Sequence, residues 1–251
     1  MKRTRPTIIA LAMSLLAVPA MAQEKADDLG YFNHLSAGLT LGTTGIGIDL
    51  TAPIGEYLEL NAGYSFMPRL SYKTDVHYKR KGKERETEVE GKLHMGDFKL
   101  LLNYFPFRGS SFRLTGGFYI GKKELVSAEN TESVNRFDDG TDFEEGEGLE
   151  MGDYIVGFNK DGFAKASIKV NSFKPYVGIG IGRNIPRNTI GVSADLGVQF
   201  WGSPAVYEQQ TGTEQKLEEK HTSHKDGGAI KTLSKISVWP VLTIRIGGKL
   251  F

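Results

Sequence analysis

The stretch that decides the fold is Thr189–Trp201, TIGVSADLGVQFW, together with Ile236–Phe251, ISVWPVLTIRIGGKLF. In the first stretch, apolar residues occupy every second position, and the positions between them hold glycine or a polar residue. Successive side chains of a β-strand point to opposite faces, so this alternation gives each strand one apolar and one polar or small face. Both stretches are therefore predicted to be amphipathic strands.

The same alternation recurs in six earlier stretches, which makes eight predicted strands. The six are Leu35–Gly42, Ile46–Ala52, Leu58–Phe66, His94–Phe105, Phe112–Gly121 and Phe173–Gly182. The connections between them differ in length. Short turns are expected at Pro53–Glu56, Arg108–Ser111, Arg183–Asn188 and Thr43–Gly45, and long charged connections at Pro68–Leu93, Lys122–Asn171 and Gly202–Ser234. The second of these is expected to be the longest irregular stretch of the chain.

The amino-terminal residues 1–22 have the pattern of a cleaved secretory signal peptide. Lys2, Arg3 and Arg5 precede the apolar run Ile8–Val18, and the small residues Ala20 and Ala22 form a cleavage motif. Cleavage would remove three of the 31 basic residues and none of the 30 acidic ones, which leaves a formal charge of −2 on residues 23–251. This balance argues against a nucleic-acid partner. The chain contains 0 cysteines, which excludes a lipid anchor on cysteine, disulfides and thiolate metal sites.

The loop lengths place the predicted strands in a membrane. After the signal, no run approaches the roughly 18 apolar residues of a membrane-spanning helix, so a spanning structure would have to be a closed barrel. The three long connections and the tight turn Thr43–Gly45 lie on one side of the predicted strands, and the other three short turns lie on the opposite side, an asymmetry typical of bacterial outer-membrane barrels. A soluble β-sandwich is the main alternative, but it has no reason to sort its loops in this way. The predicted fold class is all-β: an eight-stranded antiparallel up-and-down transmembrane β-barrel with long extracellular loops.

Charged residues within the predicted strands all fall on the polar face. Six of them are Asp49, Glu59, Lys99, Arg113, Asp195 and Arg245. The interior of an eight-stranded barrel is just wide enough to be filled by side chains, and buried charges are tolerated when they are paired. Three acids and three bases can neutralise one another there, so we expect a lumen charge network that plugs the barrel.

Several runs resemble the small eight-stranded outer-membrane β-barrel proteins of Gram-negative bacteria, most of them uncharacterised. The runs are 102–107 with 112–119, 175–182, and 195–204, together with Trp239-Pro240 before the last strand. The resemblance implies the barrel fold, the outer membrane and recognition by the barrel-assembly machinery, with Phe251 as part of the assembly signal. It carries no catalytic residues. The assembly signal of such barrels usually has apolar or aromatic residues at every second position before the terminal Phe. Here Lys249 and Gly247 occupy these positions, which predicts either a register shift through a bulge at Gly247-Gly248 or a non-standard signal.

Other candidate sites have weaker patterns. His221 and His224 could bind a divalent metal, but no third ligand has a defined position, and we expect no metal and no cofactor. The acidic stretch Phe137–Glu147 lacks the spacing of an EF-hand and is interpreted as a solvated loop. The basic run Lys79–Arg85 could contact lipopolysaccharide phosphates, or it could be one arm of a β-ribbon whose other arm is the acidic Glu86–Glu90. The ribbon is favoured.

The sequence predicts a structural or surface-interaction role without catalysis, in a monomer whose partners are outer-membrane lipid and lipopolysaccharide. A narrow, porin-like channel or small-ligand carrier is the alternative from another class. A lipid A–modifying hydrolase is a further alternative, which needs a serine beside a histidine and a carboxylate. None of the five histidines can be matched to such a pair from the sequence; they are His34, His77, His94, His221 and His224.

Overall fold

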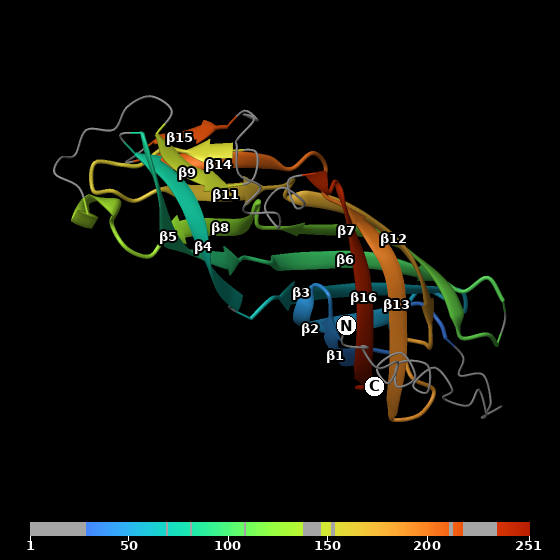
Figure 1. The fold of residues 1–251 in the computed structure, drawn as a ribbon. Coiled ribbons are helices and arrows are strands. Elements are labelled where there is room, and N and C mark those ends of the chain that lie inside the picture. Colours follow the sequence, from blue (N-terminus) through green and yellow to red (C-terminus); the bar gives the residue numbers. More distant parts are fainter. Residues whose placement is uncertain are drawn as a thin grey trace, which may run out of the picture.

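The chain forms a closed barrel of eight antiparallel strands, with a second sheet of eight strands at one end (Figure 1). The computed structural model describes residues 29–68, 70–80, 82–107, 109–137, 147–151, 154–210, 213–217 and 235–251. The barrel strands are β1 (Ser36–Gly42), β2 (Gly45–Pro53), β3 (Leu58–Phe66), β6 (Gly96–Tyr104), β7 (Phe112–Gly121), β12 (Phe173–Ile181), β13 (Ile190–Phe200) and β16 (Val238–Lys249).

Each barrel strand pairs with the barrel strands that precede and follow it along the chain, and β1 closes the ring by pairing with β16. This up-and-down topology confirms the predicted fold class, and all eight predicted strands are present within about two residues of their predicted ends. The tight turn after β1 is also confirmed. Gly42 pairs with Gly45, so Thr43 and Thr44 form the turn, and Gly45 directly after it has a φ of 98°, a backbone conformation that favours glycine.

Lys122–Asn171 was expected to be the longest irregular stretch of the chain, and this expectation was wrong, because its described residues, like those of the other two long connections, form regular strands. The three long connections fold into the second sheet, called the extension here. Its strands, in spatial order, are β10 (Tyr154–Val156), β9 (Gly148–Met151), β4 (Leu70–Arg80), β5 (Lys83–Leu93), β8 (Glu124–Asn130), β11 (Lys165–Lys169), β14 (Ala205–Gln210) and β15 (Thr213–Lys216). A short 3-10 helix, η1 (Val134–Phe137), lies between β8 and β9.

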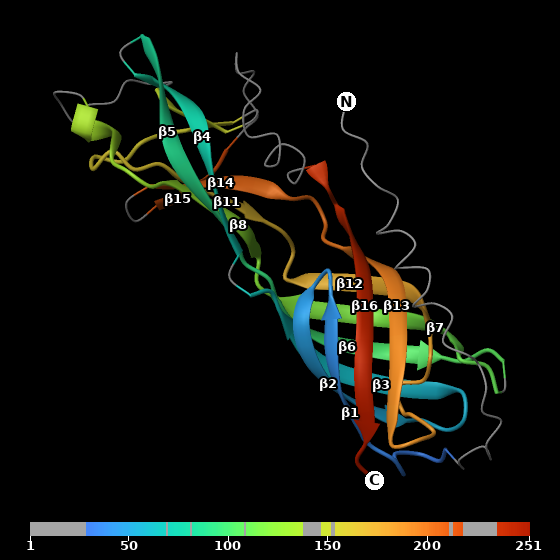
Figure 2. The same cartoon turned by 60° about the horizontal axis from the view of Figure 1, so that its bottom comes forward.

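The extension continues the barrel wall. Barrel strands β3, β6, β7, β12 and β13 lie side by side, and the chain runs from them into β4, β5, β8, β11 and β14, which lie side by side in the same order. Five neighbouring strands of the wall are thus prolonged beyond the barrel end, as both views show (Figures 1 and 2). The extension has an apolar core of its own, in which Tyr78, Leu149, Val156, Phe158 and Ile168 are buried.

The outer wall of the barrel is apolar. Every second residue of the eight barrel strands faces outward, and these positions hold aliphatic, aromatic, glycine or proline residues without one charge. Many are well exposed in the isolated chain, for example Leu39 at 65%, Val177 at 55% and Ile246 at 57%. The polar faces of the same strands point into the lumen.

The carboxyl-terminal strand keeps one register to its end. Gly38, Ala37 and Ser36 of β1 face Gly247, Gly248 and Lys249 of β16 in unbroken order, so the predicted bulge at Gly247-Gly248 is absent. Beyond β16, Leu35 donates its backbone N–H to the carbonyl of Phe251 at 3.1 Å. The Phe251 side chain is 66% exposed. The register shift is thus excluded as an explanation for the position of Phe251, and a non-standard assembly signal stays a prediction.

Some predicted features lie outside the described residues. These are the signal peptide 1–22, the histidines His221 and His224, and residues 138–146 of the acidic stretch. No helix in the described part of the chain is both long enough and apolar enough to cross a membrane.

Candidate functional site

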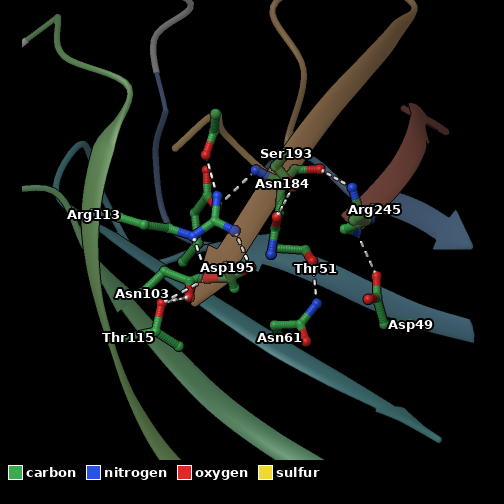
Figure 3. A network of polar contacts seen from close by, with 12 residues as sticks. Asp49, Thr51, Asn61, Asn103, Arg113, Thr115, Asn184, Ser193, Asp195 and Arg245 are labelled. Carbon is green, nitrogen blue, oxygen red and sulfur yellow. Dashed lines mark hydrogen bonds and ion pairs between the residues drawn. The ribbon is translucent and has the colours of Figure 1, made fainter. Parts of the chain in front are cut away.

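The lumen brings together the charged residues that the sequence placed on the polar face. In one group Asp49 contacts Arg245 (Figure 3) and Lys99. Its Oδ2 atom accepts a hydrogen bond from Nζ of Lys99 at 3.0 Å, and its Oδ1 atom accepts one from Nε of Arg245 at 2.7 Å. The three side chains come from β2, β6 and β16, so the contacts cross the interior rather than follow one strand pair. One carboxylate therefore neutralises part of two buried cations.

A second group forms around Arg113 of β7 and Asp195 of β13. The guanidinium donates two hydrogen bonds to the carboxylate, one of them from Nε at 3.2 Å. Such two-point pairing is the strongest arrangement for these groups. The hydroxyl of Thr115 lies 3.2 Å from Asp195 Oδ1 and 3.0 Å from Asn103 Oδ1, which extends the group across the lumen (Figure 3).

The sixth predicted residue, Glu59, meets a segment that the sequence treated only as a short turn. Residues 182–189, between β12 and β13, fold into the open end of the barrel. The backbone N–H of Asn184 donates to Glu59 Oε2 at 3.2 Å, and Arg183 Nη1 lies 3.8 Å from Glu59 Oε1. Burial is the main cause that lowers the pKa of Arg183, but a guanidinium stays protonated in proteins.

Asn184 ties this turn to three strands of the barrel, β1, β13 and β16. Its carbonyl oxygen accepts hydrogen bonds from Arg245 Nη1 at 2.7 Å and from the Ser36 hydroxyl at 2.8 Å. Its side-chain oxygen accepts one from the Ser193 hydroxyl at 2.7 Å (Figure 3). The turn is therefore the floor of the lumen, and sequence reasoning missed it because the direction in which a turn folds has no periodic signal.

Toward the extension, the lumen holds an apolar layer and then another ion pair. The rings of Tyr119 and Tyr176 meet edge to face at 5.5 Å and pack with Leu101 and Val241. Above them, Lys174 Nζ lies 2.7 Å from Asp97 Oδ1, with both side chains nearly inaccessible. The sequence analysis missed this pair, although both residues have the parity of the lumen face and the signal was present.

Two tryptophans close the barrel at the end that joins the extension. The rings of Trp201 and Trp239 stack at 4.7 Å with an interplanar angle of 9°. Trp201 is fully buried and packs with Met95, Leu125 and Val170. Between these tryptophans and the floor, the described side chains leave a cavity of about 20 Å³ beside Asp49 and Asp195. One water molecule needs roughly 10–15 Å³, so this cavity has room for about one.

Comparison with known proteins finds similar shapes only. No protein-family model matches the chain, and no curated protein matches it significantly. Five chains of solved structures match. A crystal structure of Acinetobacter baumannii CarO2 is 17% identical, with a TM-score of 0.49 over 86% of this chain and 98% of that chain. One of Acinetobacter baumannii CarO is 18% identical, with a TM-score of 0.46 over 89% and 99%. The closed barrel is assigned from the strand pairing of this chain alone and not from these two structures.

The basic run Lys79–Arg85 lies at the far tip of the β4–β5 hairpin. The expected β-ribbon exists, and Lys79 of β4 contacts Glu84 of β5 at 3.7 Å. The arms are divided differently from the prediction, because the turn falls within the basic run and Lys83, Glu84 and Arg85 already belong to β5. Among the described residues, no group of three or more histidine, aspartate and glutamate side chains could hold a metal ion.

The structure brings one histidine beside a serine and a carboxylate, which the sequence did not reveal. Nε2 of His94 lies 2.9 Å from Oγ of Ser127 and 3.6 Å from Oε1 of Glu124. A catalytic triad instead uses one ring nitrogen for the serine and the other for the carboxylate. Ser127 is also buried at 8% exposure, so a substrate has little access to its hydroxyl. The three residues therefore have neither the hydrogen-bond arrangement nor the accessibility of an acyl-transfer site.

Proposed function

We propose that this protein is an outer-membrane β-barrel of a Gram-negative envelope, with a structural or surface-interaction role, a lumen closed to solutes and no catalytic activity. The extension would stand outside the cell and the short turns would face the periplasm. Its partners would be outer-membrane lipid and lipopolysaccharide, and the barrel-assembly machinery would insert it as a monomer.

The observation that carries the proposal is the uncharged outer wall between two sets of aromatic residues. A soluble protein exposes apolar residues singly, whereas here they cover the whole barrel. Exposed aromatics mark both strand ends: Phe66, Phe98, Phe173 and Phe200 near the extension, and Tyr57, Tyr104 and Phe107 near the turns. Aromatic girdles that flank an apolar band are typical of transmembrane barrels.

Migration in SDS gels tests the membrane proposal. A folded transmembrane barrel extracted in mild detergent is expected to migrate differently before and after boiling, and to precipitate when the detergent is removed. Identical migration together with solubility in detergent-free buffer would contradict the membrane assignment.

The filled lumen supports a closed barrel over a channel. The lumen contains the charge groups, the tyrosine layer and the tryptophan pair, and the cavity beside Asp49 and Asp195 has room for about one water. The channel alternative draws support from buried polar atoms that have no hydrogen bond among the described residues, such as Asn103 Nδ2 and Glu59 Oε1. Planar-bilayer recordings separate the two, because a closed barrel gives no stable unitary current steps and a narrow channel does.

The hydrolase alternative has one observation in its favour, the contact between His94 and Ser127. Mass spectrometry of lipid A from cells with the native chain and with Ser127→Ala tests it. We expect identical lipid A species. Loss of an acyl chain only in cells with the native chain would establish the hydrolase.

A further inference from the structure

A groove of about 450 Å³ lies on the molecule where β8, β11 and β14 meet the barrel. This volume falls within the range of roughly 300–1,000 Å³ that is usual for ligand pockets. Its floor is fixed by backbone hydrogen bonds between the three chain segments that cross there. Val170 N–H donates to the carbonyl of Lys123 at 2.8 Å, and Asn171 N–H donates to the carbonyl of Trp201 at 2.9 Å.

The groove opens on the outer side of the wall. Lys169, Asn171 and Phe173 line it and are at least partly exposed, whereas Val170, which also lines the groove, and Lys174 are buried. Phe173 begins the outward row of β12, which continues with apolar residues to Ile181. With increasing distance from the apolar band of β12, the groove therefore presents the aromatic ring of Phe173, the amide of Asn171 and the ammonium group of Lys169.

Two lysines give the groove its charge. Lys169 is held in place, since its ammonium lies 5.1 Å from the ring centre of Tyr207 and contacts the carboxylate of Glu214. Lys123 makes no ion pair with any described residue. Ser172 and Ser203 line the same groove, and a serine hydroxyl can donate a hydrogen bond. Two cations and two hydroxyl donors suit an anion with several oxygen atoms.

The height of the groove matches a lipid headgroup. Four residues of extended chain from Phe173 to Lys169 span about 13 Å, and strand tilt reduces the height to about 10 Å. The headgroup layer adds about 5–7 Å on each side of the apolar core, and a lysine reaches down by its flexible stem. The basic tip of the β4–β5 hairpin, by contrast, stands the full length of β4 away from the barrel (Figure 2).

We propose that this groove binds the phosphate-bearing headgroup of an outer-leaflet glycolipid, with Lys123 and Lys169 on the phosphate and Phe173 against the first part of an acyl chain. The inference rests on the proposed outer-membrane location. It moves the lipopolysaccharide contact from the basic run Lys79–Arg85, where the sequence suggested it, to the barrel edge.

Native mass spectrometry of the full-length protein in zwitterionic detergent tests the site, with bisphosphorylated lipid A as the probe. Lysines near an anionic lipid contribute about fivefold in affinity each, so the variant Lys123→Gln/Lys169→Gln is expected to bind lipid A on the order of 30-fold more weakly. Glu214→Gln is expected to bind more tightly, because it frees Lys169 from its carboxylate. Lys165→Gln is the matched control, since Lys165 lies on the same face of β11 but farther from the barrel.

Two further probes identify the source of the phosphate. Dephosphorylated lipid A is expected to bind the native chain as weakly as bisphosphorylated lipid A binds the double variant, and inorganic phosphate is expected not to bind detectably. The proposal is overturned if the double variant binds lipid A like the native chain, if dephosphorylated lipid A binds equally well, or if inorganic phosphate competes for the site. All variants are checked for boiling-dependent migration. If the native chain shows boiling-dependent migration but its binding of lipid A does not depend on the phosphate groups, only the groove proposal is contradicted. If its migration does not depend on boiling, the membrane assignment is contradicted.

Discussion

Nε of Arg245 on β16 lies 2.7 Å from Oδ1 of Asp49 on β2, and the two strands are separated by β1. The ion pair therefore joins the wall on both sides of the strand that closes the barrel. The remaining oxygen of Asp49 binds Lys99, so this carboxylate connects three of the eight strands directly. The closure of the ring and the charge of the lumen thus depend on the same residue.

Asp49→Asn is expected to destabilise the barrel strongly. The variant keeps the shape of the side chain but leaves two buried cations without their carboxylate. Breaking a buried ion pair by removal of one partner costs about 3–5 kcal/mol. The free energy of unfolding, measured by denaturant titration in lipid vesicles, checks this value. Glu88→Gln, which breaks a solvent-exposed pair in the extension, is the control and should change the unfolding free energy far less.

Gly38→Ala is expected to separate Arg245 from Asp49. A Cβ atom at Gly38 would overlap the guanidinium of Arg245 and meets no other group first. Crowding of this kind costs about 1–3 kcal/mol. Gly116→Ala is the matched control, because a Cβ atom there meets no heavy atom within 4 Å. In an Arg245→Met background the effect of Gly38→Ala should shrink, and an undiminished effect would contradict the explanation.

The strands and the residues that face the lumen could be predicted because both follow from the alternation of apolar and polar residues at every second position. Alternation places Asp49, Glu59 and Arg245 inside as soon as the apolar face is assigned to the outside, and the same parity would have found Lys174 and Asp97. These positions require no knowledge of which strand pairs with which.

The partners of these charges could not be predicted, because they depend on which strands face one another across the ring. Arg113 meets Asp195 over the intervening β12, and Arg183 reaches Glu59 from a turn that has no period. The extension was missed for a related reason. Only the β4–β5 ribbon was expected. The other strands of the extension are short, and stretches such as Glu124–Asn130 and Thr213–Lys216 have the composition of a loop although they form strands.

The ion pair between Lys73 and Glu88 in the extension predicts a measurable pKa. Lys73 Nζ lies 2.8 Å from Glu88 Oε1. Hydrogen bonds from Lys73 and then from Thr131 lower the pKa of Glu88 below its ordinary value of 4.5, and the pKa of Lys73 is raised above 10.5 by the same bond. The contribution of Glu88 to stability is present above pH 4.5 and is lost as the pH falls through the lowered pKa. That of Lys73 is present below pH 10.5 and is lost as the pH rises through the raised pKa.

Carboxyl NMR titration of the glutamates measures the shift. In Lys73→Gln, the pKa of Glu88 is expected to rise toward 4.5, since its strongest hydrogen-bond donor is gone. Lys92→Gln should instead raise the pKa of Glu90, whose lowered pKa is caused mainly by Lys92, and leave Glu88 unchanged. A pKa of Glu88 that is the same in Lys73→Gln and the native chain would show that the ion pair does not form in solution.

An arginine on the outer wall should cost stability in proportion to its depth in the membrane. Ile244 lies at the middle of β16 and Val238 at its end, and the two are similarly exposed at 44% and 41%. An arginine at the bilayer midplane costs about 2–4 kcal/mol, which falls to about 0–1 kcal/mol near the interface. In lipid vesicles, Ile244→Arg is therefore expected to lower the unfolding free energy by about 2–4 kcal/mol and Val238→Arg by much less. In a soluble barrel both residues would face water, both arginines would be hydrated, and the two variants would unfold alike. The difference between the two variants is thus a direct measure of whether the apolar wall meets lipid.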